Sequence, residues 1–182
     1  MTNVVAVDCD GVLADFERAF CEKFGWDNRH LACLEERYPD ESYLIDIFVS
    51  VSKTYESLDI VPLGVDIVKF LVNNGFLIHI VTARPKYCCK VTGVWLKQNK
   101  IPFHYLTFGA KEKLSAYMSI NPALIIEDDF QTAVGAARLG YYSFLIDQPW
   151  NFSVDSYGVK RIRTFEKFKM DFDEISETLS LF

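Results

Sequence analysis

Four short runs of apolar residues punctuate the chain, and each run gives way to polar or small residues. The runs are VVAV at 4–7, FLIHIV at 76–81, ALII at 123–126 and YYSFLI at 141–146. Runs that are continuous, rather than alternating with polar residues, are typical of strands that are covered on both faces. The pattern therefore predicts buried strands at these positions.

Between these runs, apolar residues recur every three or four positions, which is the spacing of an amphipathic helix. The segments of this kind contain Phe16, Phe20 and Phe24; Val65, Val68, Phe70, Leu71 and Val72; Trp95 and Leu96; and Leu114, Tyr117 and Met118. Strands that alternate with helices indicate an α/β fold built on a doubly wound parallel sheet.

Residues 17–60 interrupt this alternation. A strand is normally followed within about a dozen residues by its crossover to the next parallel strand, yet the second apolar run begins at residue 76. We expect a small, mostly helical cap at 17–60, inserted into a core formed by residues 1–16 and 61–182.

The C-terminal segment also has helical spacing. Its apolar positions are Phe165, Phe168, Phe172, Ile175 and Leu179. We expect an amphipathic helix that covers the sheet. A contact in a homodimer is the alternative use of the same apolar stripe.

Composition narrows the class of protein. Half of the 182 residues are hydrophobic, enough for a sizeable core, and the net charge of −6 without a Lys/Arg cluster argues against a nucleic-acid polymer as partner. The five cysteines show no CxxC spacing and are expected to be reduced thiols. We find neither a secretory-type start nor an apolar run long enough for a membrane span, so we expect a cytoplasmic protein.

Acidic and hydroxyl residues follow three of the predicted strands. The stretches are Asp8-Cys9-Asp10-Gly11, Thr82-Ala83-Arg84 and Glu127-Asp128-Asp129. Ligands of open parallel sheets bind outside the carboxyl ends of the strands, and residues two apart in an extended chain point the same way. Asp8 and Asp10 could thus face one ligand, although DCDG could also be an ordinary turn.

Crowded acids need a cation. If these strands are neighbours, up to five carboxylates share one pocket, and each pair 4 Å apart repels by about 4 kcal/mol at an effective dielectric near 20. Oxygen ligands favour a hard ion such as Mg²⁺, and the sequence offers no His and Cys set for a softer metal. We therefore predict Mg²⁺ as the cofactor.

A phosphate could complete this site. The hydroxyl of Thr82 and the backbone N–H groups that follow it can hold a phosphoryl oxygen, and a Lys in FGAKEKLSAY could contact the same group. Thr82 could equally be a β-branched strand residue, and the lysines could be solvated surface residues.

In chain order, the stretches DCDGV, VTAR, AKEK and IIEDD resemble the four motifs of the haloacid dehalogenase-like superfamily of phosphatases, over residues 4–146. The resemblance implies that Asp8 is a nucleophile that forms an aspartyl-phosphate and that Asp10 is the general acid/base. It also implies substrate binding by Thr82, Ala83, Arg84 and a Lys. The implied magnesium site is made by Asp8, Asp128, Asp129 and the backbone carbonyl of Asp10.

Two positions stay open within these motifs. Lys111 and Lys113 both fit the third motif, and the usual spacing of the superfamily favours Lys113. The fourth motif offers Glu127, Asp128 and Asp129, and we expect Asp128 first and Asp129 second as metal ligands. Arg84 could reach the substrate or form a structural salt bridge.

Longer stretches are similar to the 5'(3')-deoxyribonucleotidase group. They are DGVLADF followed by an insertion, VTARP followed by a helix with Trp and Leu, and LIDQPWN. This similarity implies a nucleoside monophosphate as substrate. The base would then stack on aromatic rings of the cap, unless these rings pack within it. The candidates are Trp26, Tyr38, Tyr43, Phe48 and Tyr55.

Three alternatives remain. The same chemistry could act on a sugar phosphate or a nucleic-acid 3' phosphate. The fold could serve as a non-catalytic binding module, against which the presence of both Asp8 and Asp10 argues. A mutase also carries both aspartates, whereas a dehalogenase carries the first alone.

Overall fold

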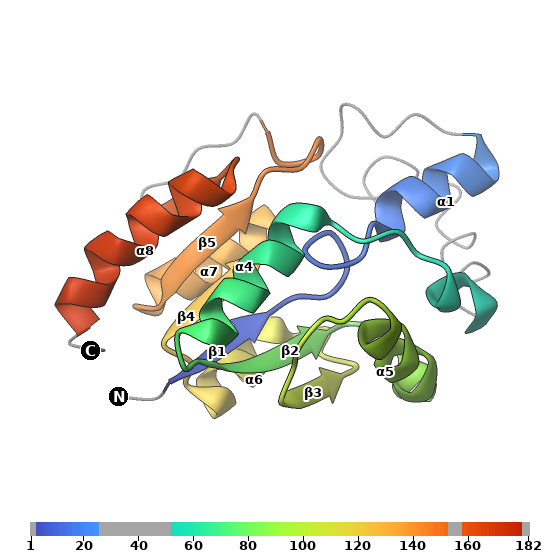
Figure 1. Cartoon of the computed structure of the whole chain (residues 1–182), viewed down its shortest axis with the longest axis horizontal. Coiled ribbons are helices and arrows are strands. Elements are labelled where there is room, and N and C mark those ends of the chain that lie inside the picture. Colours follow the sequence, from blue (N-terminus) through green and yellow to red (C-terminus); the bar gives the residue numbers. More distant parts are fainter. Residues whose placement is uncertain (1–2, 26–51, 153–157, 180–182) are drawn as a thin grey trace.

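The structure is a computed structural model that describes residues 3–25, 52–152 and 158–179. Its described strands form one parallel sheet of six strands in the order β3-β2-β1-β4-β5-β6 (Figure 1). The strands are β1 (Val4–Val7), β2 (Leu77–Thr82), β3 (Tyr105–Phe108), β4 (Leu124–Glu127), β5 (Tyr142–Ile146) and β6 (Val159–Ile162). The predicted doubly wound α/β fold is confirmed.

Helices cover both faces of the sheet. They are α1 (Phe16–Phe24), α4 (Pro62–Asn73), α5 (Cys89–Gln98), α6 (Lys113–Ile120), α7 (Phe130–Arg138) and α8 (Phe165–Leu179), with short 3₁₀ turns η2 (Ser52–Glu56) and η3 (Lys86–Cys88). Residues of α4, α5 and α8 join the larger core on one face, and residues of α6 and α7 pack on the other. In Figure 1, α4 and α8 lie in front of the sheet and α6 and α7 behind it.

Two strands gave no clear signal in the sequence. β3 and β6 are the edge strands of the sheet, and each has four residues. Tyr105 of β3 is half exposed, and β6 reads VKRI. An edge strand is covered less completely than a central one, so it lacks the continuous apolar run by which the inner strands were predicted.

Packing of α4 fixes the loop that follows β1. A Cβ atom on Gly64 would lie 1.8 Å from the carbonyl oxygen of Val12. Helix and loop therefore touch backbone to backbone, which glycine alone permits at this position. Because Val12 is four residues beyond Asp8, the contact also holds the first of the predicted motifs in place.

The C-terminal helix covers the sheet as predicted. Phe168, Phe172 and Ile175 of α8 are buried. The rings of Phe168 and Phe172 meet the ring of Phe70 in α4 edge to face, at centroid distances of 5.9 and 5.5 Å, a favourable geometry for aromatic pairs. The homodimer stays a prediction.

The two ends of the predicted insertion lie side by side. The N–H of Asp15 donates to the carbonyl of Asp59 at 2.9 Å, and the N–H of Val61 donates to the carbonyl of Leu13 at 2.8 Å. A segment can be inserted here without disturbing the sheet, because the chain leaves and returns at neighbouring positions. Residues 26–51 lie outside the described residues, so the boundaries and helical content of a cap at 17–60 stay a prediction.

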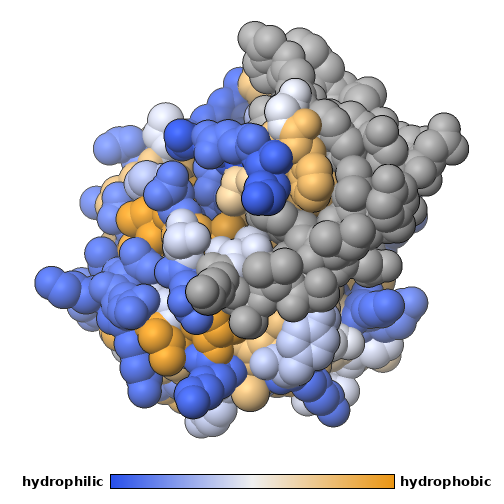
Figure 2. Space-filling view, turned by 90° about the vertical axis from the view of Figure 1, so that its right-hand side faces the viewer, coloured by the Kyte–Doolittle hydropathy of each residue, from blue (hydrophilic) through white to orange (hydrophobic). Residues whose placement is uncertain are grey.

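One face of the molecule shows where apolar residues reach the surface. Figure 2 views the molecule from the side on which α1 lies, and its described part mixes hydrophilic residues with separate hydrophobic ones. Within residues 3–25, 52–152 and 158–179, none of the helices has both the length and the apolar character needed to cross a bilayer. Four cysteines in these ranges, Cys9, Cys21, Cys88 and Cys89, are free thiols, and Cys33 lies outside them. The cytoplasmic location stays a prediction.

The contact at Gly64 can be tested by adding one methyl group. We expect Gly64→Ala to lower the free energy of unfolding by about 1–3 kcal/mol, because the methyl group must displace backbone. Gly93 in α5 is the matched control: it has open space around its Cβ position, so Gly93→Ala should stabilise the protein by up to about 1 kcal/mol. Urea unfolding of both variants measures the difference, and equal effects would contradict the packing argument.

Candidate active site

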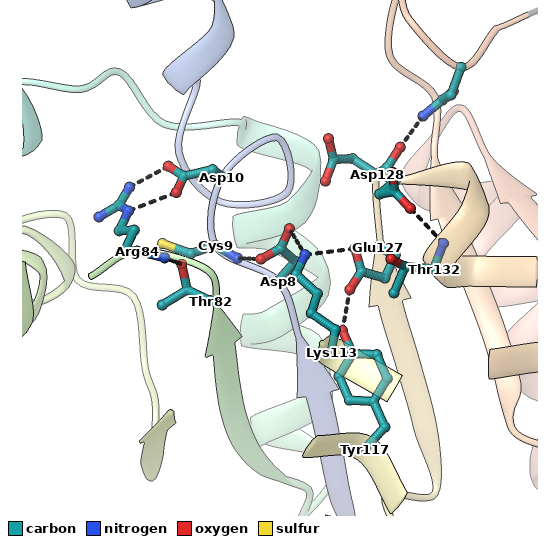
Figure 3. Close-up of polar contacts among 12 residues, drawn as sticks. Asp8, Cys9, Asp10, Thr82, Arg84, Lys113, Tyr117, Glu127, Asp128 and Thr132 are labelled. Atoms are coloured by element: carbon teal, nitrogen blue, oxygen red, sulfur yellow. Dashed lines mark hydrogen bonds and ion pairs between the residues drawn. The ribbon is translucent and has the colours of Figure 1, made fainter. Parts of the chain in front are cut away.

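The predicted site residues meet at the carboxyl ends of three neighbouring strands. Asp8 directly follows β1, Thr82 ends β2 and Glu127 ends β4 (Figure 3). β1 lies between β2 and β4, so the chain order of the sheet reverses here. Such a reversal is the usual place for a ligand in an open parallel sheet. The N–H of Asp8 still donates to the carbonyl of Ile126, at 3.0 Å, which holds the end of β1 against β4.

A tight loop follows Asp8. The carbonyl of Cys9 accepts hydrogen bonds from the N–H groups of Leu13 and Ala14, at 2.8 and 2.9 Å. Gly11 has a φ of +77°, and a Cβ atom on it would lie 2.1 Å from Oδ2 of Asp128. Gly11 therefore meets two demands, a left-handed backbone and close approach to a carboxylate. The loop brings the first and fourth motifs into contact.

Lys113 is the cation beside Asp8. It is the first residue of α6, and its Nζ lies 2.5 Å from Oδ2 of Asp8 and 3.1 Å from Oε2 of Glu127. Burial opposes its charge, but attraction to Asp8 and Glu127 outweighs this and raises the pKa of Lys113 above its usual value. Lys111 is exposed. The structure thus places Lys113, as the spacing of the motifs favoured, against the predicted nucleophile.

Glu127 is fully buried beneath this ion pair. Besides Lys113, it accepts a hydrogen bond from the hydroxyl of Tyr117, which lies one helical turn after Lys113 in α6 and thus on the same face. Burial raises the pKa of Glu127 to about 7, although the charge of Lys113 counteracts this. The sequence motifs had not identified Tyr117, whose i, i+4 spacing from Lys113 was the signal available.

Three carboxylates form a cluster that can bind a metal. One oxygen from each of Asp8, Glu127 and Asp128 lies within 4.8 Å of the others, and all three residues are buried. Burial raises the pKa of Asp8 and of Asp128, and for Asp128 the nearby charge of Asp8 adds to the effect. A hard divalent cation would remove this penalty, and the all-oxygen donor set is the kind that Mg²⁺ prefers.

Asp10 lies apart from this cluster. Nε and Nη2 of Arg84 donate to the two carboxylate oxygens of Asp10, at 2.8 and 2.5 Å. Figure 3 shows the Asp10 side chain turned toward Arg84, while the Asp8 side chain points toward Lys113. The side chain of Asp10 remains 27% exposed, whereas that of Arg84 is buried. The two aspartates of DCDG thus do not share one partner in this conformation.

The guanidinium group of Arg84 has further partners besides Asp10. Its Nη1 donates to Oγ1 of Thr92 at 3.0 Å, and its guanidinium carbon lies 4.4 Å from the ring centroid of Tyr55 and 5.9 Å from that of Trp95. Arginine over an aromatic ring gains cation–π attraction. Arg84 therefore joins the end of β2 to α5 and to Tyr55 of η2, which lies within the predicted insertion at 17–60. Tyr55 is buried by these contacts.

The remaining predicted residues have separate positions. Thr82 is buried, and its hydroxyl oxygen accepts the N–H of Arg84 at 3.1 Å, which leaves its own O–H to donate. Ala83 is exposed at the strand end. Asp129 caps α7 by accepting the N–H of Thr132 at 2.5 Å. Of the three acids in the fourth motif, Glu127 and Asp128 belong to the cluster, whereas Asp129 is the N-cap of α7.

The fold is shared with solved structures, among them one determined in complex with phosphate. No protein-family model matches the chain, and no curated protein matches it in sequence. CbbY from Rhodobacter sphaeroides, solved in complex with phosphate, superposes with a TM-score of 0.59 at 15% identity and covers 91% of this chain and 95% of its own.

Two further solved structures share the fold. A HAD-superfamily hydrolase from Ehrlichia chaffeensis has a TM-score of 0.53 at 13% identity and covers 96% of this chain and 98% of its own. A predicted phosphatase from Clostridium acetobutylicum has a TM-score of 0.55 at 16% identity, with both chains covered completely, at 100%. At these identities the likeness establishes the fold, so the chain has the fold of the haloacid dehalogenase-like hydrolases.

Proposed function

We propose that the protein is a Mg²⁺-dependent phosphomonoester hydrolase that forms an aspartyl-phosphate on Asp8. The observation that carries the proposal is the surroundings of Asp8: a buried carboxylate with Lys113 at 2.5 Å on one side and the oxygens of Glu127 and Asp128 within 4.8 Å. A carboxylate nucleophile beside a fixed cation and a metal site is suited to phosphoryl transfer.

Asp8, Glu127 and Asp128 would hold the magnesium ion. Their oxygens are close enough to one another to share one ion. When bound there, magnesium supplies positive charge that offsets the charge on the phosphoryl oxygens. Asp129, expected as a ligand from the motifs, has its side chain committed to the start of α7. The resemblance gives Asp10 a place in the metal shell through its backbone carbonyl, which leaves its side chain to pair with Arg84. We therefore assign the metal to the cluster of three.

The proposed reaction proceeds in two displacements. In the first, an oxygen of Asp8 attacks phosphorus and the bond from phosphorus to the leaving oxygen breaks. Asp10, which releases one nitrogen of Arg84 to take up a proton from solvent beforehand, gives that proton to the leaving oxygen. In the second, Asp10 takes a proton from water, the water oxygen bonds to phosphorus, and the bond from phosphorus to Asp8 breaks to release phosphate. Lys113 and the hydroxyl of Thr82 stabilise negative charge on the phosphoryl oxygens.

Arg84 acts on Asp10 in this proposal. Its guanidinium is engaged by Asp10, Thr92 and the ring of Tyr55, so a direct contact with substrate would require these partners to be given up. A bidentate pair also fixes the orientation of a carboxylate. We therefore treat Arg84 as a positioning residue for the general acid/base, in place of the substrate contact that the motif implies.

For the substrate we propose nucleoside monophosphates. Support comes from the similarity of DGVLADF, VTARP and LIDQPWN to the deoxyribonucleotidase group. Four of the aromatic residues expected to meet the base, Trp26, Tyr38, Tyr43 and Phe48, lie outside the described residues. Tyr55 lies within them, and its ring packs against Arg84 and Phe16, so it has a packing role.

A small sugar phosphate is the second candidate. The observation that favours it is the structural similarity to a variant of CbbY from Rhodobacter sphaeroides that was solved with xylulose-(1,5)bisphosphate, with a TM-score of 0.58 at 14% identity. Both candidates are phosphorylated small molecules. In this proposal the segment at 17–60 would determine which of the two the site accepts.

The reaction is tested by replacing the nucleophile. We expect wild-type protein to release phosphate from a monophosphate with MgCl₂ and to stop when EDTA is added. Asp8→Asn should lower kcat on the order of 10⁴-fold or more, because an amide cannot form the intermediate. Asp66→Asn, on the exposed side of α4, is the matched control and should keep full activity. Activity that survives in Asp8→Asn would sink the assignment.

The role of Arg84 is tested with two leaving groups. Protonation by Asp10 matters most when the leaving oxygen is basic. We expect Arg84→Met to slow the first turnover about 10- to 100-fold for a nucleoside 5'-monophosphate, to slow p-nitrophenyl phosphate much less, and to leave both KM values unchanged. The exposed Arg138 supplies the control Arg138→Met. A higher KM for both substrates would instead indicate that Arg84 binds the phosphate.

The substrate class is tested by a phosphate-release panel. The panel compares deoxy- and ribonucleoside 3'- and 5'-monophosphates with ribose 5-phosphate and glucose 6-phosphate, all with MgCl₂. We expect kcat/KM to be at least about tenfold higher for a nucleoside monophosphate than for either sugar phosphate, because contacts to the base add specificity. A sugar phosphate at the top of the ranking would overturn the nucleotidase proposal while leaving the phosphatase intact.

A further inference from the structure

The turn that follows β5 reaches both acidic loops of the site. Residues 147–151 read DQPWN, the end of the LIDQPWN stretch, and none of their side chains belongs to the cluster of three carboxylates. Nε2 of Gln148 donates to the carbonyl of Gly11 at 2.7 Å. Nε1 of Trp150 donates to Oδ2 of Asp128 at 3.0 Å. One turn therefore contacts the loop after β1 and the end of β4 at the same time.

Asn151 anchors this turn. It is 1% exposed, and its Nδ2 donates to the carbonyls of Asp128 and Ile146, at 2.7 and 2.9 Å. Its Oδ1 accepts the N–H of Gln148 at 3.1 Å and Nη2 of Arg161 at 3.1 Å. A buried side chain with partners just after β4, at the end of β5 and in β6 has little freedom to move. The positions of Gln148 and Trp150 are fixed by it.

The Asp128 carboxylate is held from two sides. Its Oδ2 accepts the indole N–H of Trp150 and lies 2.1 Å from the position that a Cβ atom on Gly11 would take. Gly11 is in turn held by Gln148. Rotation of the carboxylate away from this position would break the hydrogen bond to Trp150.

We propose that residues 148–151 form a bracket that sets the orientation of Asp128 for the metal ion, with Trp150 as the positioning residue. The inference rests on the proposed function, because it takes the cluster of Asp8, Glu127 and Asp128 as the magnesium site. Trp150 would act through its N–H on the metal ligand Asp128 and would not contact the reacting atoms itself.

The physical reason is preorganisation. A free carboxylate must lose rotational freedom when it binds an ion, whereas a carboxylate already hydrogen-bonded by its neighbours has lost it on folding. Residues that hydrogen-bond to metal ligands commonly change metal affinity 10- to 100-fold when they are replaced. The bracket thus gives LIDQPWN a role in metal binding, separate from any contact with the nucleoside.

The test measures Mg²⁺ binding without substrate. Trp150→Phe keeps an aromatic ring and removes the N–H that Asp128 accepts. Trp95→Phe is the matched control, because the N–H of Trp95 donates to the carbonyl of Leu58 at 2.8 Å, outside the cluster. Calorimetric titration with MgCl₂, and the rise of the unfolding midpoint with MgCl₂ concentration, give the affinity of wild type and both variants.

We expect Trp150→Phe to bind Mg²⁺ about tenfold more weakly, with little change in the unfolding midpoint in EDTA, and Trp95→Phe to bind as wild type does. Gln148→Met, which removes the donor to Gly11, should also weaken binding. Wild-type affinity in Trp150→Phe, or an equal loss in Trp95→Phe, overturns the bracket alone. Absence of Mg²⁺ binding to the wild-type protein would overturn the metal assignment of the proposed function and, with it, the proposed role of residues 148–151.

Discussion

Three carboxylates are buried together at the carboxyl ends of β1 and β4, and the local structure is arranged around their charge. At a separation near 4 Å, each pair of ionised carboxylates would repel by about 4 kcal/mol at an effective dielectric near 20. Lys113 offsets part of this by pairing with Asp8 and Glu127. Burial raises the pKa of both Glu127 and Asp128, and the nearby charge of Asp8 adds to the effect. A divalent cation would offset both contributions.

Several features of the fold follow from holding these groups in place. α6 begins at Lys113, so its first turn supplies the Lys113 ammonium group and the next residue on the same face, Tyr117, donates a hydrogen bond from its hydroxyl to Glu127. Gly11 lets the loop after β1 pass against Asp128, and Gly64 lets α4 press on the same loop through Val12. These backbone contacts restrict movement of the loop after β1. A site that depends on the positions of charged side chains requires such a rigid support.

The two aspartates of DCDG are separated by their cationic partners. Asp8 pairs with Lys113 and Asp10 with Arg84, so neighbours in sequence enter different environments. In the proposed reaction this division suits a nucleophile and a proton-transfer group, which need different surroundings. Arg84 also packs on Tyr55 of η2, a segment inside the predicted insertion at 17–60. The position of that segment and the orientation of Asp10 are therefore linked through one side chain.

The sequence by itself determined the fold class, the inner strands and the strand ends at which acidic and hydroxyl residues gather, because continuous apolar runs and the polar residues after them are local signals. It did not reveal the edge strands β3 and β6, whose residues are less completely covered. Tertiary structure alone decided which acids come together: Glu127 and Asp128 join Asp8, while Asp129 caps α7. It also turned Asp10 toward Arg84 and brought Trp150 to Asp128 across 22 positions of the chain. Such pairings depend on side-chain directions at the ends of separate strands, which no local pattern encodes.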